Sequence, residues 1–173
     1  PNPDLVFGFN LGLAYKNFDM SAFFYGSSGK EAINYVKWWV DFVPSFQGAK
    51  SKDALYNSWV KGGDAAKNAQ AKVPIQEESG NFSTNGVPNS YYMENASYFR
   101  MKNLSIGYNI PTSVLSRAKI DRLRIYVQAT NLFTITKYTG LDPEIIGGDQ
   151  AFGFDAGVYP TVKQFYFGVN LGF

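Results

Sequence analysis

The sequence contains neither cysteine nor histidine among its 173 residues. Without cysteine the chain forms no disulfide and carries no thiolate nucleophile. Without histidine it lacks the most common acid–base group and the most common metal ligand in proteins. We therefore expect no enzyme activity, no bound metal and no cofactor.

The sequence also lacks a strong excess of charge and any long apolar run. Its 16 Lys and Arg against 14 Asp and Glu leave a net charge of +2, and no basic cluster stands out that would track a phosphate backbone. Nucleic acid is therefore not an expected partner. No run of 18 or more apolar residues is present, so we expect no membrane-spanning helix. The mean hydropathy of −0.20 agrees with that expectation.

Aromatic residues and glycine are abundant. Phe, Tyr and Trp make up 17% of the chain, as 15 Phe, 12 Tyr and 3 Trp, and there are 17 Gly. High aromatic and glycine content with few charges and moderate hydropathy is typical of a β-rich protein. It is compatible with a transmembrane β-barrel, whose aromatic girdles lie at the two membrane interfaces.

Five segments alternate between apolar and polar or small residues. A period of two predicts β-strands, because successive side chains point to opposite faces. In QFYFGVNLGF, for example, Phe165, Phe167 and Val169 lie on one face while Tyr166 and Gly168 lie on the other. The predicted strands lie near residues 4–15, 18–26, 98–110, 121–132 and 161–173. The predicted fold class is therefore all-β, with antiparallel strands.

Strand length and connection length indicate a membrane barrel. The strands run to about ten residues, longer than the usual five or six and suited to a tilted span of hydrocarbon. Short connections after the first and third strands alternate with long ones after the second and fourth, as in outer-membrane barrels. Because outer-membrane barrels have an even number of strands, five strands cannot close one, and we expect this antiparallel sheet of about five strands to be a segment of a larger transmembrane β-barrel. A soluble β-sandwich would show the same alternation, so that alternative stays open.

The long connection at 27–96 is predicted to be an outer loop that is partly helical. EAINYVKWWVDFV has apolar residues at helical spacing and is followed by Pro44, while SKDALYNSWV (51–60) is predicted as a second short helix beginning at Ser51. All three tryptophans, Trp38, Trp39 and Trp59, lie in this loop. They are candidates for stacking on sugar rings or contacting a partner, or they pack a small core within the loop.

The polar faces of the third and fourth predicted strands are expected to line a barrel lumen. Asn and Gln amides and Tyr rings suit hydroxylated cargo, although the same residues would line any water-filled interior. The candidate residues are Asn103, Ser105, Asn109, Arg124, Tyr126 and Gln128.

Two segments suggest chemistry that we set aside. Asp142 and Glu144 in LDPEI are spaced such that they could form a glycosidase pair if they were brought to the required separation. They also fit an ordinary turn around Pro143. GGDQAFGFDAG (147–157) contains Asp and Gly residues, as calcium-binding loops do, but it lacks the ligand spacing of an EF-hand. We interpret these segments as a turn and an outer loop.

Several spaced motifs resemble one family. The segments ENASYFRMKNLSIGYNIPTSVL, DRLRIYVQATNLFTITKYTGLDPEI and YPTVKQFYFGVNLGF are similar to the C-terminal end of SusC/RagA-type TonB-dependent outer-membrane transporters. YKNFDMSAFFYGSSG (15–29) also resembles a family segment, with Asn17 in place of the usual glycine. The resemblance covers almost the whole chain and is weakest across 30–90. It extends neither to the family's plug domain nor to its TonB-binding N-terminal segment, which we expect to be absent from residues 1–173.

The resemblance implies a location and a function. Transporters of this type import oligosaccharides or peptides across the outer membrane of Gram-negative bacteria, powered through TonB, with a SusD-like surface lipoprotein as a lid. The ending also resembles the signal read by the barrel-assembly machinery, here Gly168, Leu171 and Phe173. The expected partners are the lid, TonB, the bilayer, the assembly machinery and the cargo. A passive porin and a soluble carbohydrate-binding β-sandwich are the alternatives.

Overall fold

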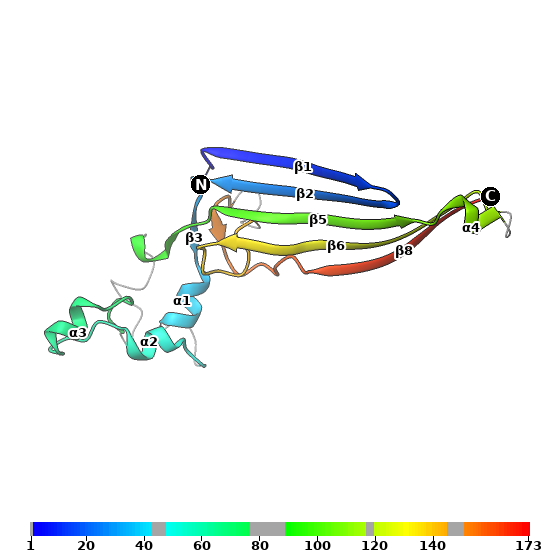
Figure 1. Cartoon of the computed structure of the whole chain (residues 1–173). Helices are drawn as coiled ribbons and strands as arrows, with labels where there is room; N and C mark the ends of the chain where they lie inside the picture. Colours follow the sequence, from blue (N-terminus) through cyan, green and yellow to red (C-terminus); the bar gives the residue numbers. More distant parts are fainter. Residues whose placement is uncertain (1, 43–47, 77–88, 117–119, 145–150) are drawn as a thin grey trace. The chain divides into compact units, whose positions relative to one another are not determined.

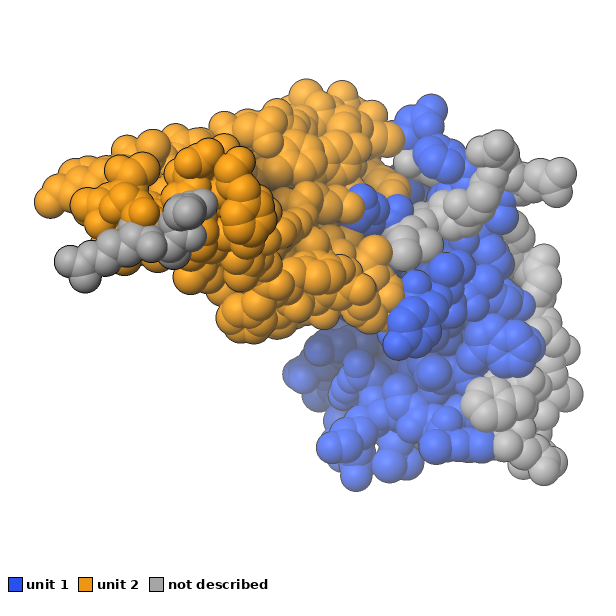
Figure 2. Space-filling view, turned by 90° about the vertical axis from the view of Figure 1, so that its right-hand side faces the viewer, with its two compact units in different colours: residues 1–2, 31–95, 138–159 blue, residues 3–30, 96–137, 160–173 orange. Residues whose placement is uncertain are grey.

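The computed structural model describes residues 2–42, 48–76, 89–116, 120–144 and 151–173. The chain divides into two compact units, coloured separately in Figure 2. The sheet unit comprises Pro3–Lys30, Ala96–Lys137 and Pro160–Phe173, and the loop unit comprises Pro1–Asn2, Glu31–Asn95 and Tyr138–Tyr159.

The sheet unit is one antiparallel sheet of five strands in the order β1-β2-β5-β6-β8 (Figure 1). Each strand pairs with its neighbour in antiparallel register, so the expected antiparallel sheet is present. The strands are β1 (Leu5–Tyr15), β2 (Phe18–Ser28), β5 (Tyr98–Asn109), β6 (Arg122–Thr136) and β8 (Gln164–Gly172). A short helix, α4 (Thr112–Leu115), lies in the connection between β5 and β6.

Several strand bounds differ from those predicted. β2 continues to Ser28, and β6 continues to Thr136, past the predicted end at 132. The alternation of β6 is interrupted at Asn131, whose φ of 50° is left-handed, and the β5–β6 register shifts between Met101 and Asn103. A bulge of this kind offsets the faces by one residue while pairing continues. The final strand begins at Gln164, three residues later than predicted.

The register collects bulky apolar side chains on one face of the sheet. Phe9 and Phe24 stack with ring centroids 4.8 Å apart, and Phe24 stacks on Phe99 at 5.5 Å. The ring of Phe7 covers Gly26, where a Cβ atom would lie 2.4 Å from Phe7 Cζ. Stacked cross-strand aromatic pairs stabilise neighbouring strands beyond the area they bury.

This apolar face is open to its surroundings along the outer strands. Leu11 is 51% exposed, Val169 is 61% exposed and Phe167 is 86% exposed. A soluble antiparallel sheet normally packs its apolar face on a core, and contiguous exposed apolar patches of this kind mark an interaction surface. The face therefore requires an apolar environment from outside the described residues. Separately, none of the helices among those residues is both long enough and apolar enough to cross a membrane.

The loop unit contains a small three-stranded sheet in the order β4-β3-β7, with β3 and β7 parallel. Its strands are β3 (Glu31–Asn34), β4 (Met93–Asn95) and β7 (Phe154–Asp155), and its helices are α1 (Val36–Asp41), α2 (Lys52–Tyr56), α3 (Ala65–Ala69) and the 3-10 helix η2 (Ser90–Tyr92).

The predicted helix in EAINYVKWWVDFV is only partly correct. Residues Glu31–Asn34 form β3, and the helix begins at Val36. Pairing of β3 with β4 and β7 overrides the helical spacing, and that pairing depends on segments far away in the sequence. Pro44, the expected boundary, lies outside the described residues. The second predicted helix spans Lys52–Tyr56 and is capped by Ser51, whose hydroxyl accepts from Ala54 N at 3.0 Å.

A small core holds the loop unit together. Phe42, Val73 and Tyr92 are buried, with exposures of 0%, 3% and 7%, and Trp38 and Tyr91 pack against them. The ring of Phe42 meets that of Tyr91 at a centroid distance of 5.5 Å and an interplanar angle of 76°. The described part of the long connection therefore has an aromatic core of its own.

Candidate functional site

The six residues predicted to line a lumen lie together on the polar face of the sheet. Ser105 pairs with Gln128, Asn109 pairs with Arg124, and Tyr126 lies opposite Gly107. Since partners directly opposite each other share a face and alternate residues repeat it, Asn103 joins the same surface. That this face borders a lumen stays a prediction.

An ion pair crosses three strands on this polar face. Arg124 Nε donates to Asp19 Oδ2 at 2.9 Å, and Asn109 Nδ2 donates to the same oxygen at 3.1 Å. The Arg124 side chain passes over Gly107, where a Cβ atom would lie 2.4 Å from Nε. Asp19 was not predicted as a site residue, because the lumen candidates were taken only from the third and fourth predicted strands.

Tyr126 covers Gly168 on the next strand. A Cβ atom at Gly168 would lie 2.2 Å from Tyr126 Cζ, so only glycine leaves room for the ring. The guanidinium carbon of Arg124 lies 4.9 Å from the Tyr126 ring centroid, within cation–π range. Gly168 and Leu171 lie in β8, and Phe173 follows the strand with 86% of its surface exposed. Their role as an assembly signal stays a prediction.

The three predicted tryptophans have different environments. Trp38 stacks on Tyr35, with centroids 5.6 Å apart and an interplanar angle of 4°, and packs against the loop core. Trp39 meets Trp38 edge-on at 4.7 Å and is 41% exposed, as is Trp59. Trp38 therefore serves the fold of the loop unit, while Trp39 and Trp59 keep the exposed ring area that a ligand or partner contact needs.

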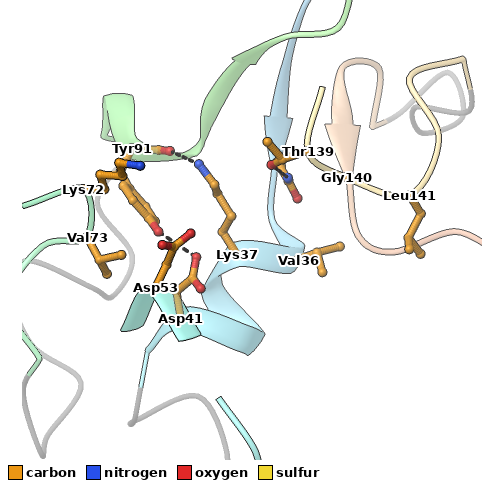
Figure 3. Close-up of a pocket in the computed structure, with 11 residues that line it drawn as sticks. Val36, Lys37, Asp41, Asp53, Lys72, Val73, Tyr91, Thr139, Gly140 and Leu141 are labelled. Atoms are coloured by element: carbon orange, nitrogen blue, oxygen red, sulfur yellow. Dashed lines mark hydrogen bonds between the residues drawn. The ribbon is translucent and has the colours of Figure 1, made fainter. Parts of the chain in front are cut away.

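A pocket of about 310 Å³ opens within the loop unit (Figure 3). α1 contributes Lys37 and Asp41 to its wall, α2 contributes Asp53, and Tyr91 and Thr139 come from segments distant in sequence. In Figure 3 the Lys37 amine points toward Tyr91, while the carboxylates of Asp41 and Asp53 lie on the side of the Tyr91 hydroxyl. Sequence reasoning missed this pocket because its walls come together only through tertiary packing.

An ion pair closes one side of the pocket. Lys37 Nζ lies 2.8 Å from Glu94 Oε1 and donates to the Tyr91 carbonyl oxygen at 3.1 Å. Glu94 also accepts from the Thr139 backbone N–H at 2.8 Å. Burial opposes ionisation of Glu94, but the hydrogen bonds from Lys37 and Thr139 outweigh it and hold the Glu94 pKa below its ordinary value.

A buried carboxylate closes the other side. Asp41 is 5% exposed and accepts from the Tyr91 hydroxyl at 2.6 Å and from the Ser51 hydroxyl. Burial raises the pKa of Tyr91, and its hydrogen bond to Asp41 raises it further. Tyr91 therefore remains a protonated donor throughout the physiological pH range, and the Asp41 charge is satisfied inside the wall.

Asn34 lines the pocket and has a buried amide oxygen. Its side chain is buried, at 2% exposure, and its Nδ2 donates to Glu94 Oε1 at 3.2 Å and to Thr139 Oγ1 at 3.3 Å. Within the described part of the chain, Asn34 Oδ1 has no hydrogen-bond partner. Buried polar atoms are nearly always paired, so this oxygen is an uncommon feature.

The segments set aside as non-catalytic have structural roles. Asp142 is buried and accepts from the Glu144 backbone N–H at 3.0 Å, which forms a turn around Pro143. Asp155 is 1% exposed and accepts from the Tyr138 hydroxyl at 2.5 Å. Residues 147–150 lie outside the described residues. Among the described residues no group of three acidic side chains is arranged to hold a metal ion.

Comparison with known proteins gives relatives of much greater length. No family model matches the chain. It is 36% identical to TonB-dependent receptor P3 of Formosa agariphila, across 100% of this chain and 17% of the relative. It is 30% identical to TonB-dependent receptor SusC of Bacteroides thetaiotaomicron, across 100% of this chain and 15% of the relative.

Solved structures agree with these relatives. The RagAB peptide importer in its "closed-closed" state superposes on 98% of this chain with a TM-score of 0.77 and 28% identity, and the match covers 17% of that chain. A second structure, of the RagAB peptide transporter, superposes on 95% with a TM-score of 0.75 and 31% identity. The antiparallel sheet described above therefore matches part of a known receptor. TonB-dependent receptors are transport proteins of the Gram-negative outer membrane and are not enzymes. The chain is homologous to SusC/RagA-type TonB-dependent receptors and spans 15% to 17% of the length of the relatives it matches.

Proposed function

We propose that this chain forms the C-terminal part of the barrel of an outer-membrane active importer that is energised through TonB and covered by a SusD-like surface lipoprotein. The observation that carries the proposal is the five-stranded sheet with one exposed apolar face and one polar face. In this proposal lipid covers the apolar face and the polar face borders the lumen or the plug, as strands of a transmembrane barrel require.

The sheet edges support a larger barrel. Within the described residues, β1 pairs only with β2, and β8 pairs only with β6. An unpaired strand edge in hydrocarbon costs several kcal/mol for each backbone group. Strands from the remainder of a longer protein would remove that cost by pairing with both edges and closing the barrel.

Peptides are the cargo class that we favour, with oligosaccharides as the alternative. The support is the likeness to the RagAB peptide importer, a two-component complex, at 28% and 31% identity. The same likeness supports a partner of the RagB or SusD type. Trp39 and Trp59, each 41% exposed, are the loop side chains that we propose for contact with that partner or the cargo.

Two alternatives predict different behaviour. A passive porin would share the strands but would transport without TonB. A soluble carbohydrate-binding sandwich would bury the apolar face, and the exposure of Val169 and Phe167 argues against it.

The test uses the native polypeptide that carries this sequence. Extracted from membranes in detergent, it should have an intact mass far above 19.3 kDa and should copurify with a lipoprotein. Uptake of a fluorescent oligopeptide by cells should require both this protein and TonB. Uptake that persists without TonB would establish the porin alternative, and a soluble 19.3 kDa species would establish the sandwich.

A further inference from the structure

We propose that residues 51–73 of the loop unit form a docking surface for the lid lipoprotein and bind an apolar projection of the lid that is bordered by carboxylates. The inference rests on the proposed function, because it specifies where the lid of the same transporter makes contact. The segment contains α2 and α3, and the hollow at its centre shares no lining residue with the pocket in Figure 3.

The segment is folded before a partner arrives. Asp64 caps α3, because its carboxylate accepts from the backbone N–H of Lys67 at 2.8 Å. The Asn68 side chain binds both backbone groups of Val60: its Oδ1 accepts from Val60 N at 2.9 Å, and its Nδ2 donates to Val60 O at 2.7 Å. A surface that is ordered in advance lowers the conformational cost of binding.

Apolar side chains of this segment are exposed and lie around one hollow. Leu55, Tyr56 and Val60 are 72%, 75% and 55% exposed, and all three line a hollow of about 430 Å³. Trp59, next to Val60, is 41% exposed, whereas Ala54 is the buried residue of α2. A single exposed apolar side chain is ordinary, but a group of them around a hollow indicates an interaction surface.

Lysine side chains border the hollow. Lys67 lines it, and Lys61 directly follows Val60 in its wall. Lys52 lies one helical turn before Tyr56 on α2. All three lysines are exposed, and within the described part of the chain none of their ammonium groups has a hydrogen-bond or ion-pair partner.

The charge of the segment indicates an acidic partner. It contains four Lys and two Asp, which leaves a net charge of +2. Both aspartates already accept a hydrogen bond inside the segment, one from the Asn57 side chain and one from a backbone N–H. Because interfaces pair potentials of opposite sign, the complementary surface carries carboxylates around its apolar centre.

A protein surface fits this segment better than a membrane or a short peptide does. The hollow accepts a projecting side chain, which a flat layer of lipid headgroups does not supply. Exposed Tyr and Trp with a charged border are typical of the centre and rim of a protein–protein interface. The RagAB importer is a two-component complex, and the lid is the partner proposed above, so we assign the surface to the lid.

The first test measures rebinding of the lipoprotein that copurifies with the full-length transporter, by surface plasmon resonance in detergent. Tyr56→Ala should raise the Kd by about tenfold, as truncation of an aromatic side chain at the centre of an interface does. Tyr159→Ala is the matched control, because Tyr159 is 79% exposed and lies outside the hollow. It should bind the lipoprotein as the wild type does.

A charge reversal tests the lysine border. Lys61→Glu should slow association by about threefold at an ionic strength of about 0.05 M, and the difference should disappear at about 0.5 M. Lys163→Glu changes an exposed lysine just before β8 and should leave the association rate unchanged. Equal slowing by the two reversals would mean that the charges of residues 51–73 do not guide docking, and would overturn the acidic-partner assignment.

Hydrogen exchange supplies a measurement that needs no variant. The lipoprotein should slow exchange at 52–60 and 64–71 in the wild type. Without the lipoprotein, Tyr56→Ala should exchange across 51–73 as the wild type does, which separates a lost contact from lost folding. If the lipoprotein leaves exchange in these segments unchanged, or if the two tyrosine variants bind it equally well, the docking surface is wrongly assigned.

The outcomes also separate this inference from the proposed function. A lipoprotein that binds the wild type without protecting residues 51–73 would overturn the docking surface alone. Absence of any copurifying lipoprotein would overturn the proposed lid as well. Protection of these residues by vesicles that contain lipopolysaccharide, in place of the lipoprotein, would reassign the surface to the membrane and overturn the docking assignment.

Discussion

The guanidinium of Arg124 on β6 spans the intervening strand β5 and binds the carboxylate of Asp19 on β2, with Arg124 Nε 2.9 Å from Asp19 Oδ2. The contact is made over Gly107, which has no side chain to obstruct it. The pair joins three neighbouring strands at the end of the sheet where the turn at Lys16 and Asn17 lies. A bidentate arginine–carboxylate contact of this kind also fixes orientation.

Gly107→Ala should break this pair. The new methyl group would lie 2.4 Å from Arg124 Nε, so the guanidinium must move away from Asp19. Since both side chains are partly exposed, at 16% and 35%, we expect a loss of about 1 kcal/mol in the free energy of unfolding. Urea titration of the full-length protein in lipid vesicles measures this loss of unfolding free energy.

Gly12→Ala is the control for this prediction, because no atom lies within 4 Å of a Cβ at Gly12. It should leave the free energy of unfolding within about 0.5 kcal/mol of the wild type, as surface substitutions usually do. If Gly107→Ala and Gly12→Ala lower the free energy of unfolding equally, the loss at Gly107 does not come from breaking the ion pair.

Gly168→Ala should disturb pairing of the last strand with β6. Its methyl group would meet the rigid Tyr126 ring, with Cζ 2.2 Å away, and overpacking of this type costs about 1–3 kcal/mol. The fraction of protein that reaches the membrane in heat-resistant, folded form measures the effect. Gly172→Ala, whose new methyl would make only an ordinary contact with Arg122 at 3.6 Å, should assemble normally.

A double variant separates packing from recognition by the assembly machinery. Adding Tyr126→Ala to Gly168→Ala removes the clashing ring. Recovery of folded protein would show that Gly168 is required for packing. Continued failure, with Tyr126→Ala alone assembling, would show that the assembly machinery requires glycine at this position.

Adjacent substitutions on β8 test which face meets lipid. Phe167 is 86% exposed on the apolar face, and Tyr166 lies on the opposite face across from Gln128. Arginine on the lipid-facing side near the membrane midplane costs about 2–4 kcal/mol, so Phe167→Arg should lower the free energy of unfolding in vesicles by that amount. Tyr166→Arg should lower the free energy of unfolding much less, because position 166 lies on the polar face. The reverse ranking would invert the assignment of lipid and lumen faces.

The loop unit should lose stability in acid through Glu94. Its pKa is lowered by Lys37 and Thr139 despite burial, so its contribution is fully present above the ordinary value of 4.5. That contribution disappears as pH falls through the lowered folded-state pKa. We expect faster hydrogen exchange across residues 31–42 below about pH 4.5. The free energy of opening of this segment should fall by about 1–2 kcal/mol, because the charge-assisted contacts of Glu94 are lost.

Glu94→Gln should remove this acid-dependent step, because its amide does not titrate. Glu31→Gln, at an exposed glutamate on β3, should retain it. An acid step that survives in Glu94→Gln would assign the transition to another carboxylate.

The alternation of apolar and polar residues was sufficient to predict the sheet and its two faces. In β8, for example, Phe165, Phe167 and Val169 lie on one face of the sheet, and Tyr166 and Gly168 lie on the other, as the period of two requires. The alternation was insufficient where the register shifts, at Phe23–Phe24 and near Asn131. A bulge exchanges the faces locally, and its position depends on the partner strand.

The sequence by itself determined the strand pattern, the grouping of the polar side chains and the resemblance to a transporter family, because local periodicity and short motifs carry that information. Only the tertiary structure decided that Asp19 reaches Arg124 over Gly107 and that Trp38 packs inside while Trp39 remains exposed. It also decided that Asn34, Lys37, Tyr91 and Thr139 enclose one pocket. Those residues are separated by as many as 105 positions, and only packing of the intervening segments brings them together.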